Sequence, residues 1–473
     1  MSTAIIWFRQ DLRCQDNSAL TAACHEHDIV IPLYIAENNL KHLGSAQKWW
    51  LHHSLLALKK NLQSHGLNLL LVSGSALSKL QELITTYQVD TVYWNRRYQA
   101  WEIEQDKKIK VALNKNKVSI KSFKGNLFFE PWEIQNQKGD YFKVFPPFWR
   151  HCFPKINQFD SLSIIKKWPH CPKVHTEDLK DWGLLPTKPN WADKFKTIWQ
   201  PGENGGLQKL SFFIENNLSN YQINRDYPAK NASSSLSPHL HFGEISLGQI
   251  WHAVNSVVEN KSYHASSIEQ FLTELGWRDF CYHQLYHLPQ ITIQNLKPQF
   301  NHLSWRVSNK DFTKWCQGKT GFPMVDAGMR QLWQTGFMHN RLRMITASFL
   351  VKNLLIDWRS GAKWFFDTLL DADLAINSFN WQWIAGSGFE ACPPFRIFNP
   401  ITQGEKFDPN GDYIKTWLPE LTNVSKKWIH KPWLEPNLPL KFSQDYSPPM
   451  VDLQITRQHA LAQYRDLKNF TQK

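Results

Sequence analysis

The chain lacks the sequence features that define several large classes of protein. Its seven Cys residues are odd in number and form no Cys-x-x-Cys pair, which fits reduced thiols better than a disulfide framework. No apolar stretch approaches spanning length, and no basic region precedes an apolar one at the N-terminus, so we expect neither a membrane helix nor a signal peptide. The most ligand-like His pair, His239 and His241, has no further ligand at zinc spacing and is interpreted as structural. These absences indicate a cytoplasmic protein without a bound metal.

Two further absences concern ligands. No Gly-x-Gly-x-x-Gly follows the first apolar run, where residues 7–13 read Trp-Phe-Arg-Gln-Asp-Leu-Arg instead, so the standard dinucleotide fingerprint is missing. The 54 Lys and Arg outnumber the 41 Asp and Glu and give a net charge of +13, but they form no run of like sign. This balance favours a polyanionic partner, although it also serves solubility alone. What the chain has in abundance is 23 Trp and 29 Phe, rings that suit cores, base stacking and electron relay.

The order of apolar patterns predicts the fold. Residues 1 to about 125 alternate short β-branched runs with amphipathic stretches, which predicts a parallel sheet of about five strands with helices on both faces. Prolines then interrupt every periodic segment of a linker with short helices, and the pattern after Leu207 is helical almost throughout. The predicted domains are an α/β domain at 1–130, a linker at 131–206 and a larger all-α domain at 207–473. The expected strands are 4–8, 29–35, 68–72, 91–94 and 118–123, and the expected helices of the first domain are 17–27, 46–65, 77–87 and 101–113.

One predicted helix has the chemistry of a pocket. Residues 337–349 contain no Pro or Gly and carry apolar residues at helical spacing, with Gly336 as a hinge before them. The side chains expected on its open face are Phe337, Asn340, Arg341 and Met344, and those expected to be buried are Leu342, Ile345, Phe349 and Leu350. An amide, arginines and a thioether suit a flat, anionic ligand and not acid–base chemistry, because neither Asn nor Arg exchanges a proton near neutral pH. A core helix with solvated charges is the ordinary alternative.

Two other segments carry polar groups at helical positions. Residues 231–243 place hydroxyls ahead of a Pro and a helix, where they can bind phosphate or merely cap the helix. Residues 269–287 place Glu274, Trp277, Arg278 and Cys281 on one helix face. There a carboxylate could accept a hydrogen bond from a base while the indole stacks. A surface Glu–Arg pair over a core Trp is the commoner arrangement.

The chain resembles the photolyase/cryptochrome family through several long motifs, and the resemblance runs in order over essentially the whole chain. The motifs are Trp-Phe-Arg-Gln-Asp-Leu-Arg at 7–13, Thr-Gly-Phe-Met-His-Asn-Arg-Leu-Arg-Met at 335–344, Trp-Gln-Trp at 381–383 and Phe-Arg-Ile-Phe-Asn-Pro at 395–400. The chain is most similar to the bacterial class I cyclobutane pyrimidine dimer photolyases. The resemblance implies a Rossmann-like domain joined by a long linker to an all-α FAD-binding domain. It also implies a deoxyribodipyrimidine photo-lyase, in which light-excited reduced FAD passes an electron to a dimer flipped out of DNA, the cyclobutane ring opens, and the electron returns.

The resemblance implies roles for individual residues. Arg343 pairs with Asp371, and Asn377 faces N5 of the flavin, where an amide can accept a hydrogen bond and favour reduced flavin without adding a charge. The full set implied to bind FAD is Tyr221, Ser233, Ser234, Ser235, Leu236, Ser237, Phe271, Arg278, Arg343, Asp371, Ala372, Asp373 and Asn377. The set implied to bind the dimer or its flanking phosphates is Arg225, Glu274, Trp277, Asn340, Arg341, Met344, Trp383, Arg396 and Lys406. The residues implied to act in catalysis are Glu274, Asn377 and three relay tryptophans that run from flavin to surface, Trp381, Trp358 and Trp305.

Some positions depart from the family pattern. Phe379 stands where small residues are usual, and Phe271 and Phe337 stand where some members have Trp. Trp101 and Glu102 occupy the place of the Asn–Glu pair that binds a folate antenna, so a second chromophore could be folate, deazaflavin, another flavin or absent. The expected partner is DNA with cyclobutane pyrimidine dimers. We expect a monomer that needs no protein partner and no membrane.

Three other functions compete with dimer repair. A six-four photoproduct photolyase is disfavoured because that group resembles a pattern with His at the positions of Asn340 and Met344. A cryptochrome-type light sensor is disfavoured because such sensors often carry long C-terminal extensions and another residue opposite N5, whereas this chain ends at Lys473 and has Asn377. A basic flavoprotein or nucleic-acid-binding module without catalysis is the third alternative.

Overall fold

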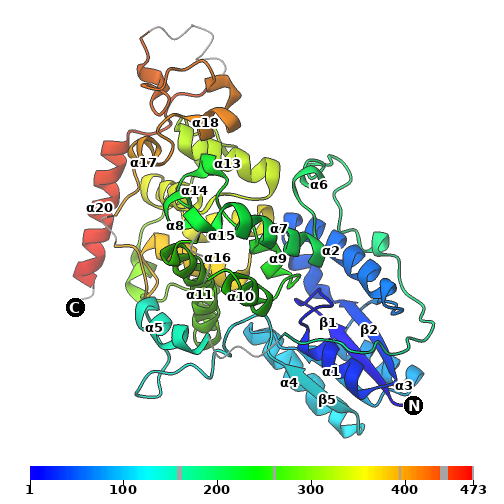
Figure 1. Ribbon diagram of the computed structural model, residues 1–473. Helices are drawn as coiled ribbons and strands as arrows, with labels where there is room; N and C mark the ends of the chain where they lie inside the picture. Colours follow the sequence, from blue (N-terminus) through cyan, green and yellow to red (C-terminus); the bar gives the residue numbers. More distant parts are fainter. Residues whose placement is uncertain (157–161, 259–262, 394–395, 437–445, 471–473) are drawn as a thin grey trace. The chain divides into compact units, whose positions relative to one another are not determined.

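The chain folds into two compact units that are interleaved along the sequence. The computed structural model describes residues 1–156, 162–258, 263–393, 396–436 and 446–470. Unit 1 comprises Met1–Phe142, Pro146–Ser219 and Ser234–Pro289, and unit 2 comprises Lys143–Phe145, Asn220–Ser233 and Gln290–Lys473 (Figure 1). The domain limits predicted at 130 and 206 follow the order of the chain and stay a prediction. The observed units differ from the predicted domains in that residues 234–289 belong to the same unit as the N-terminal sheet.

Unit 1 contains a five-stranded, all-parallel sheet in the order β3-β2-β1-β4-β5. The strands are β1 (Thr3–Phe8), β2 (Ile29–Ala36), β3 (Leu70–Ser73), β4 (Thr91–Asn95) and β5 (Ser119–Phe123). The connecting helices are α1 (Ser18–Glu26), α2 (Ser45–Ser64), α3 (Ala76–Tyr87) and α4 (Ala100–Lys115), drawn from blue to cyan in Figure 1. The predicted α/β domain is confirmed, and its elements lie within about two residues of their predicted bounds. The order in which successive strands are added to the sheet reverses between β1 and β4, so the carboxyl ends of these two strands form a topological switch point.

Local sequence explains where these helices begin. Asn17 accepts a hydrogen bond from the N–H of Leu20 and so caps α1. Gln99 and Glu102 form a reciprocal capping box at the start of α4. In central β1 and β4 every residue is buried, as a strand covered on both faces requires. The apolar helix faces complete one core with these strands.

Among the described residues between 131 and 289, α-helices follow each other without a further strand. They are α5 (Phe145–Ile156), α6 (Phe195–Ile198), α7 (Glu203–Asn216), α8 (Tyr221–Asn224), α9 (Ser237–His241), α10 (Leu247–Asn255) and α11 (Ala265–His287). The predicted short helices of the linker are therefore present. Part of the linker lies along the edge strand β3, where the N–H of Glu177 donates to the carbonyl oxygen of Leu71 at 2.9 Å. This contact blunts an edge that would otherwise be open to pairing.

Every regular element described after residue 289 is a helix. The α-helices are α12 (Asn309–Cys316), α13 (Pro323–Thr335), α14 (Asn340–Ser348), α15 (Trp358–Thr368), α16 (Leu374–Ala385), α17 (Pro400–Phe407), α18 (Asp412–Trp417) and α20 (Leu453–Phe470). A π-helical turn, η7 (Phe349–Asn353), continues α14. The predicted all-α character of this part of the chain is confirmed.

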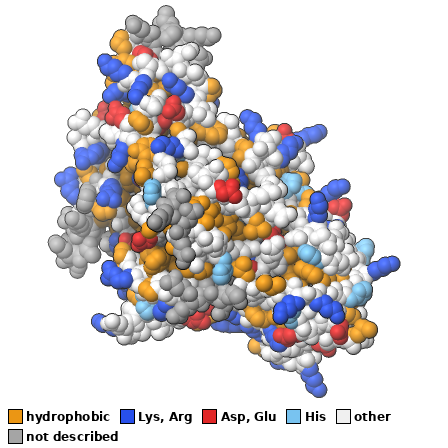
Figure 2. Space-filling model, viewed as in Figure 1, with side chains coloured by type: hydrophobic (Ala, Val, Ile, Leu, Met, Phe, Trp, Pro, Cys, Tyr) orange, Lys and Arg blue, Asp and Glu red, His pale blue; other side chains and the backbone are white. Residues whose placement is uncertain are grey.

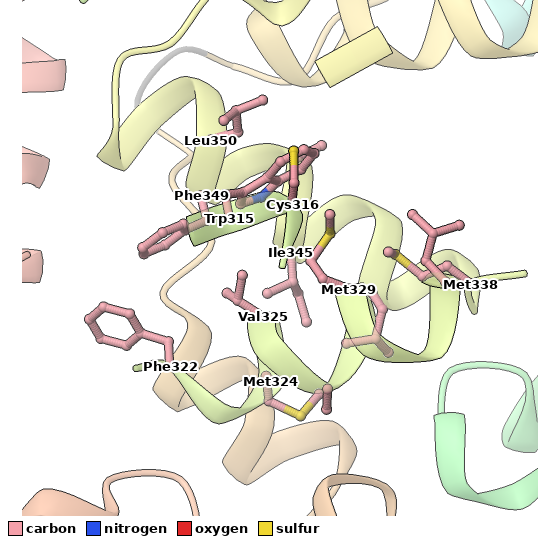
Figure 3. Packing of buried hydrophobic residues seen from close by; sticks show 14 of the residues in the cluster. Trp315, Cys316, Phe322, Met324, Val325, Met329, Met338, Ile345, Phe349 and Leu350 are labelled. Carbon is pink, nitrogen blue, oxygen red and sulfur yellow. The ribbon is translucent and has the colours of Figure 1, made fainter. Parts of the chain in front are cut away.

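The core of unit 2 is formed chiefly by α13, α14 and the helices around them. Val325, Met329 and Ile345 point into the space between α13 and α14 (Figure 3). The helices approach closely at Gly328, where an added Cβ would lie 3.1 Å from Cγ2 of Thr346. The predicted buried residues of this region, Leu342, Ile345, Phe349 and Leu350, are all fully buried. Each contributes about 1.5–3 kcal/mol through removal of its side chain from water.

One detail of the helix prediction is wrong. The predicted helix began at Phe337, but α14 begins only at Asn340, with His339 as its N-cap. Gly336 adopts a φ of 66° and ends α13 in the left-handed conformation, so it is the C-cap of the previous helix and not a hinge into the next. Phe337 therefore does not share a helix face with Asn340 and Met344. The absence of Pro and Gly could not reveal this start, because His is an uncommon cap.

The surface and the thiols agree with the composition. On the face shown in Figure 2, Lys and Arg side chains lie scattered among acidic and apolar ones. All seven Cys residues are buried free thiols. Among the residues that the structure describes, no helix has both the length and the apolar character needed to cross a membrane.

Candidate cofactor and DNA site

A pocket in unit 2 gathers residues from α14, α15, α16 and the turn before α16. The empty space that these residues surround is about 610 Å³, a figure that includes open solvent at its mouth. It is lined by Asn340, Arg343, Met344, Ala347, Phe365, Leu369, Asp371, Ala372, Ile376, Asn377, Asn380, Trp381, Trp383 and Ile384. The walls are mainly apolar and the polar groups are few, which suits a flat ring with polar edges. Residues that sequence analysis assigned to FAD and to the dimer thus line one pocket.

The predicted Arg343–Asp371 ion pair is present at this pocket. Nη2 of Arg343 lies 2.8 Å from Oδ2 of Asp371, and Nε donates to the carbonyl oxygen of Met338 at 2.8 Å. The Asp371 side chain is 3% exposed and that of Arg343 is 24% exposed. Two fixed bonds hold the guanidinium at the pocket edge, so it can meet an anionic group there without losing its orientation.

Asn377 has an orientation that suits the predicted contact with a flavin. Its Nδ2 donates to the carbonyl oxygen of Ala362 at 3.0 Å. The amide oxygen is then the atom that can accept from a ligand, and it has no hydrogen-bond partner among the described residues. A flavin N–H is such a donor. The apolar walls, the fixed guanidinium and this amide acceptor together fit the flavin part of FAD.

The start of α16 supports the same wall. The carboxylate of Asp373 accepts hydrogen bonds from the N–H groups of Ala375, at 2.9 Å, and Ile376, at 3.2 Å. It is therefore the N-cap of α16 and is 3% exposed. The predicted contact of Asp373 with the cofactor stays a prediction. What the structure adds is that this residue holds the helix that carries Asn377 and Trp381.

A second cluster of unit 2 surrounds the ring of Phe407 and contains cations predicted to meet DNA phosphates. The guanidinium carbon of Arg341 lies 4.2 Å from the centre of this ring, and Nζ of Lys406 lies 5.1 Å from it. Nη2 of Arg341 is also 2.7 Å from Oδ2 of Asp226. The phosphate-binding role stays a prediction, but the guanidinium is already paired with a half-exposed carboxylate of its own chain.

His339 joins the two chain segments of this cluster. Its Nδ1 accepts a hydrogen bond from the N–H of Arg341 at 3.1 Å, and its ring is also hydrogen-bonded to the backbone of Arg225. Burial lowers the pKa of His339 to about 4, so the imidazole is neutral near pH 7, as an accepting nitrogen requires. Arg225, another predicted phosphate ligand, is thereby tied to the start of α14. Sequence analysis did not assign any role to His339.

The predicted residues of unit 1 lie mainly on α11. Oε1 of Glu274 accepts from Nε2 of Gln270 at 2.8 Å, and Arg278 donates to the backbone carbonyl oxygens of Asn126 and Leu240. In place of the Glu274–Arg278 pair considered as the alternative, the two side chains bind different partners. Phe271 is buried against Phe213, with ring centres 4.6 Å apart. Trp277 is partly exposed.

The Ser-rich segment is partly irregular. Ser235 has a φ of 53°, and α9 begins at Ser237 after Leu236, which provides no side-chain cap. The N–H of Leu236 meets Oγ of Ser234 at 3.4 Å. An ordinary Ser cap is therefore not what this segment forms. Its role toward phosphate, together with that of Tyr221 and Ser233 in unit 2, stays a prediction.

The three predicted relay tryptophans lie in one apolar cluster. Trp358 and Trp381 are among its buried members, and Trp305 packs against it while partly exposed. The ring of Phe365 lies 5.0 Å from that of Trp381. Sequence reasoning could not show that they share a cluster, because the three residues come from distant parts of the chain. Their role in electron transfer is not tested by proximity alone.

Several lining residues escaped sequence analysis. Ile376, Asn380 and Ile384 follow the same face of α16 as Asn377, so helical spacing could have found them. Ala347 likewise follows Arg343 by one turn. Phe365 lies in α15 and Leu369 is the C-cap of that helix, and the sequence offered no functional signal for either residue. Among the other expected residues, Arg396 is exposed, and Phe395, the first residue of its motif, lies outside the described residues.

Matches to family models cover both ends of the chain. Residues 271–466 match the model described as the FAD binding domain of DNA photolyase. Residues 4–170 match the model described as DNA photolyase. The first match contains all the residues that line the pocket of unit 2.

Known proteins show the same similarity over almost the whole chain. A deoxyribodipyrimidine photo-lyase of Agrobacterium fabrum is 48% identical over 478 residues, which cover 99% of this chain and 98% of the relative. Cryptochrome-2 of Arabidopsis thaliana is 35% identical over 475 residues, covering 96% of this chain and 77% of the relative. The crystal structure of a bacterial class III photolyase from Agrobacterium tumefaciens matches with a TM-score of 0.95 at 48% identity, covering 99% of this chain and 98% of that one. Photolyases and a cryptochrome therefore share this fold.

Proposed function

Since the chain belongs to the photolyase and cryptochrome family and carries its FAD-binding domain, we propose that it is a light-dependent deoxyribodipyrimidine photo-lyase. Its proposed substrate is the cyclobutane pyrimidine dimer in DNA. The observation that carries the proposal is the pocket of unit 2, in which residues expected at the flavin, Arg343 and Asn377, lie beside residues expected at the dimer, Asn340, Met344 and Trp383. An electron donor and its acceptor have to be neighbours for this chemistry.

The chain's own residues bind and orient, and they need not exchange protons with the substrate. When bound, reduced FAD supplies a light-activated one-electron donor, which is the chemistry that ring opening of the dimer requires. Asn377 offers an amide oxygen to the flavin edge, and the Arg343–Asp371 pair offers a fixed cation to an anionic part of the cofactor. Trp383 offers a stacking surface for a flipped base, worth about 1–3 kcal/mol. No nucleophile or metal is needed for such a reaction.

Two assignments of photolyase class compete. The motifs predicted class I, whereas the 48% identical solved structure is described as a class III photolyase. We favour class III, because that identity extends over almost the whole of both chains. The proposed activity does not depend on the choice.

A light sensor without repair activity is the main alternative, and the 35% identity to a cryptochrome supports it. The residue expected opposite N5 of the flavin argues against a sensor. Light sensors often carry another residue there, whereas this chain has Asn377, which adds no charge beside a reduced flavin. A six-four photolyase is a weaker alternative, because Asn340 and Met344 stand where His is expected. Neither of these side chains can move a proton.

Illumination of the purified holoprotein with three DNA substrates tests the proposal. One duplex carries a cyclobutane thymine dimer, one carries a six-four photoproduct and one is undamaged. We expect loss of the cyclobutane dimer in light, no loss in the dark and no change in the six-four duplex. Turnover of the six-four duplex alone, or flavin photochemistry without any DNA repair, would favour one of the alternatives. The absorption spectrum of the same sample shows whether a second chromophore accompanies FAD.

A further inference from the structure

The middle tryptophan of the expected relay has a well-defined hydrogen-bond partner. Trp358, the first residue of α15, is fully buried, and its Nε1–H donates to Oδ1 of Asn295 at 2.9 Å. Nδ2 of Asn295 donates to Oδ1 of Asn301 at 2.8 Å. Because an indole N–H can only donate and the amide nitrogen is used by Asn301, the oxygen of Asn295 has to face Trp358. Asn295 itself is buried.

We propose that Asn295 stabilises the oxidised Trp358 ring through a hydrogen bond while leaving the indole proton on it, so that the electron vacancy reaches Trp358 and can move on to Trp305. The inference rests on the proposed function, in which Trp381, Trp358 and Trp305 supply an electron to the flavin. Asn295 acts through Trp358 and is therefore a positioning residue. It has not been assigned a role by the family motifs quoted above.

The electron balance of the relay is simple. Light-excited oxidised flavin is the oxidant, and it takes one electron from Trp381. Trp381 regains an electron from Trp358, which regains one from Trp305. The net result is a flavin reduced by one electron and a Trp305 oxidised by one electron. Trp305 is partly exposed, so the proton of its oxidised ring can leave to water.

The chemistry of the acceptor decides what happens at the middle step. Oxidation makes the indole N–H a much stronger acid and strengthens its hydrogen bond to any acceptor. An amide oxygen accepts that bond but is not a base near neutral pH. Trp358 then stays protonated and keeps its full power to oxidise Trp305. A carboxylate or imidazole at the same place would take the proton and trap the vacancy on Trp358.

The charged groups near Trp358 neither stabilise its oxidised ring nor accept its indole proton. The guanidinium carbon of Arg359 lies 4.9 Å from the centre of the Trp358 ring, and a cation there opposes oxidation. Nη1 of Arg359 lies 2.9 Å from Oδ2 of Asp357, so the pair has no net charge. Asp357 also accepts from the backbone N–H of Arg359 at 2.9 Å as the N-cap of α15. Its carboxylate is thus engaged elsewhere, and the indole proton meets a neutral amide.

Three variants of the FAD-loaded protein test the proposal. Asn295→Leu removes the acceptor, and Asn295→Asp replaces it by a group that takes a proton when ionised. The control Asn301→Ala removes the second hydrogen bond of Asn295 but leaves the Trp358 contact. Transient absorption after a light flash is the readout, because protonated and deprotonated oxidised indoles have different spectra. A dark ¹⁵N spectrum reports the indole N–H of Trp358, with Trp315, which donates to the carbonyl oxygen of Thr346, as internal reference.

The expected results differ for each variant. Asn295→Leu shifts the Trp358 indole signal and leaves Trp315 unmoved. It also lowers the yield of oxidised Trp305 roughly tenfold, because oxidised Trp358 loses one charge-assisted hydrogen bond and is therefore formed less readily from oxidised Trp381. Asn295→Asp shows deprotonated oxidised Trp358 and a yield at Trp305 that falls as pH rises through the pKa of the new carboxyl. The wild type and Asn301→Ala show no such pH dependence.

Two results would overturn the proposal. One is a wild-type yield of oxidised Trp305 in Asn295→Leu after the ¹⁵N spectrum has shown the bond to be lost. The other is an Asn295→Asp variant without any pH dependence, which can be measured even if Asn295→Leu fails to fold or to hold FAD. Trp381→Phe separates this failure from a failure of the relay itself. If Trp381→Phe still forms oxidised tryptophan, the relay is wrong, whereas a wrong role for Asn295 leaves the Trp381→Phe block intact.

Discussion

Two regions of the molecule place charged and amide groups in buried surroundings, and they use them in opposite ways. At the switch point of the unit 1 sheet, between β1 and β4, Arg9 lies 2.6 Å from Asp106 and also donates to the carbonyl oxygen of Asn95. In the unit 2 pocket, Arg343 and Asn377 are held from behind by Asp371 and Ala362 while they line an open space.

The difference concerns which atoms are left for a ligand. In unit 1 the side chains bridge the place where ligands bind in many open α/β sheets, and their partners are their own neighbours. The Arg97–Glu102 contact of 3.3 Å at the start of α4 is a further buried pair of this kind, and burial raises the pKa of Glu102. In unit 2 only one side of each polar group is used. The distinction therefore lies in what the unused atoms face. Nε of Arg9 and Nε of Arg97 are buried and have no hydrogen-bond partner among the described residues, whereas Arg343 and Asn377 line a pocket that a ligand can enter.

Breaking the unit 1 bridge should give the largest loss of stability. Arg9→Leu leaves the carboxylate of Asp106 buried without its partner, which should lower the free energy of unfolding by about 3–5 kcal/mol. Because we regard this pair as scaffold, the FAD content of the molecules that remain folded should not change. Denaturant unfolding and flavin absorbance measure the two quantities. Loss of FAD from folded Arg9→Leu protein would contradict the distinction between the regions.

Breaking the unit 2 pair should affect both the free energy of unfolding and the FAD content. Arg343→Leu removes the guanidinium partner of the buried Asp371 carboxylate together with the cation at the pocket edge, so we expect a loss of about 2–5 kcal/mol and loss of FAD. The matched control is Arg359→Leu, because the Arg359–Asp357 pair is more exposed, with 37% and 30% of its side chains accessible. That control should cost about 1 kcal/mol or less. Equal FAD content in the two variants would remove the cofactor role from Arg343.

A third prediction sharpens the comparison through pH. Asp279 on α11 accepts from the N–H groups of Phe128 and Phe129 at 2.7 and 3.2 Å, but its Oδ1 has no hydrogen-bond partner among the described residues. Burial raises its pKa to about 7, above the unfolded value, so the folded state binds the extra proton between about pH 4 and pH 7. This contribution to stability is therefore full below about pH 4 and is lost as pH rises through 7.

The variant Asp279→Asn removes this dependence. Relative to wild type, its free energy of unfolding should rise between pH 4.5 and pH 8 by up to about 4 kcal/mol, which corresponds to the difference between the folded and unfolded pKa of Asp279. Denaturant unfolding at a series of pH values measures the difference. A constant difference at all pH values would mean that Asp279 ionises normally, and that unit 1 satisfies this carboxylate as fully as it does Asp106.

How far sequence alone could go differs between the same regions. The strands and helices of the sheet were predicted within about two residues, because β-branched runs and amphipathic stretches report burial directly. Among the pocket residues, Arg343 was predicted because it lies in the long motif at 335–344, and Asp371 and Asn377 were predicted from the family resemblance that the motifs establish. Local pattern could not predict the neutral N-cap His339, since His is rare at that position. Nor could it predict the Arg9–Asp106 or Trp358–Asn295 contacts, because each joins residues more than 60 positions apart.

The smallest predicted effect concerns the paired guanidinium of Arg341. In the free protein it is bound to Asp226, whose side chain is 42% exposed, so a DNA phosphate has to replace an existing partner. An exposed pair of this kind is worth up to about 1 kcal/mol. Asp226→Asn should therefore tighten binding to undamaged DNA by up to about fivefold, and the dependence of affinity on salt should steepen by about one counterion. Fluorescence anisotropy across a salt series measures both the affinity and its dependence on salt.

The matched control for Asp226→Asn is Asp311→Asn, which removes one carboxylate from a different arginine, Arg306, outside the Phe407 cluster. Equal tightening in the control would show that net charge alone is responsible. Weaker binding by Asp226→Asn would show instead that Asp226 holds Arg341 in the orientation that DNA needs, which would make this pair similar in design to Arg343–Asp371.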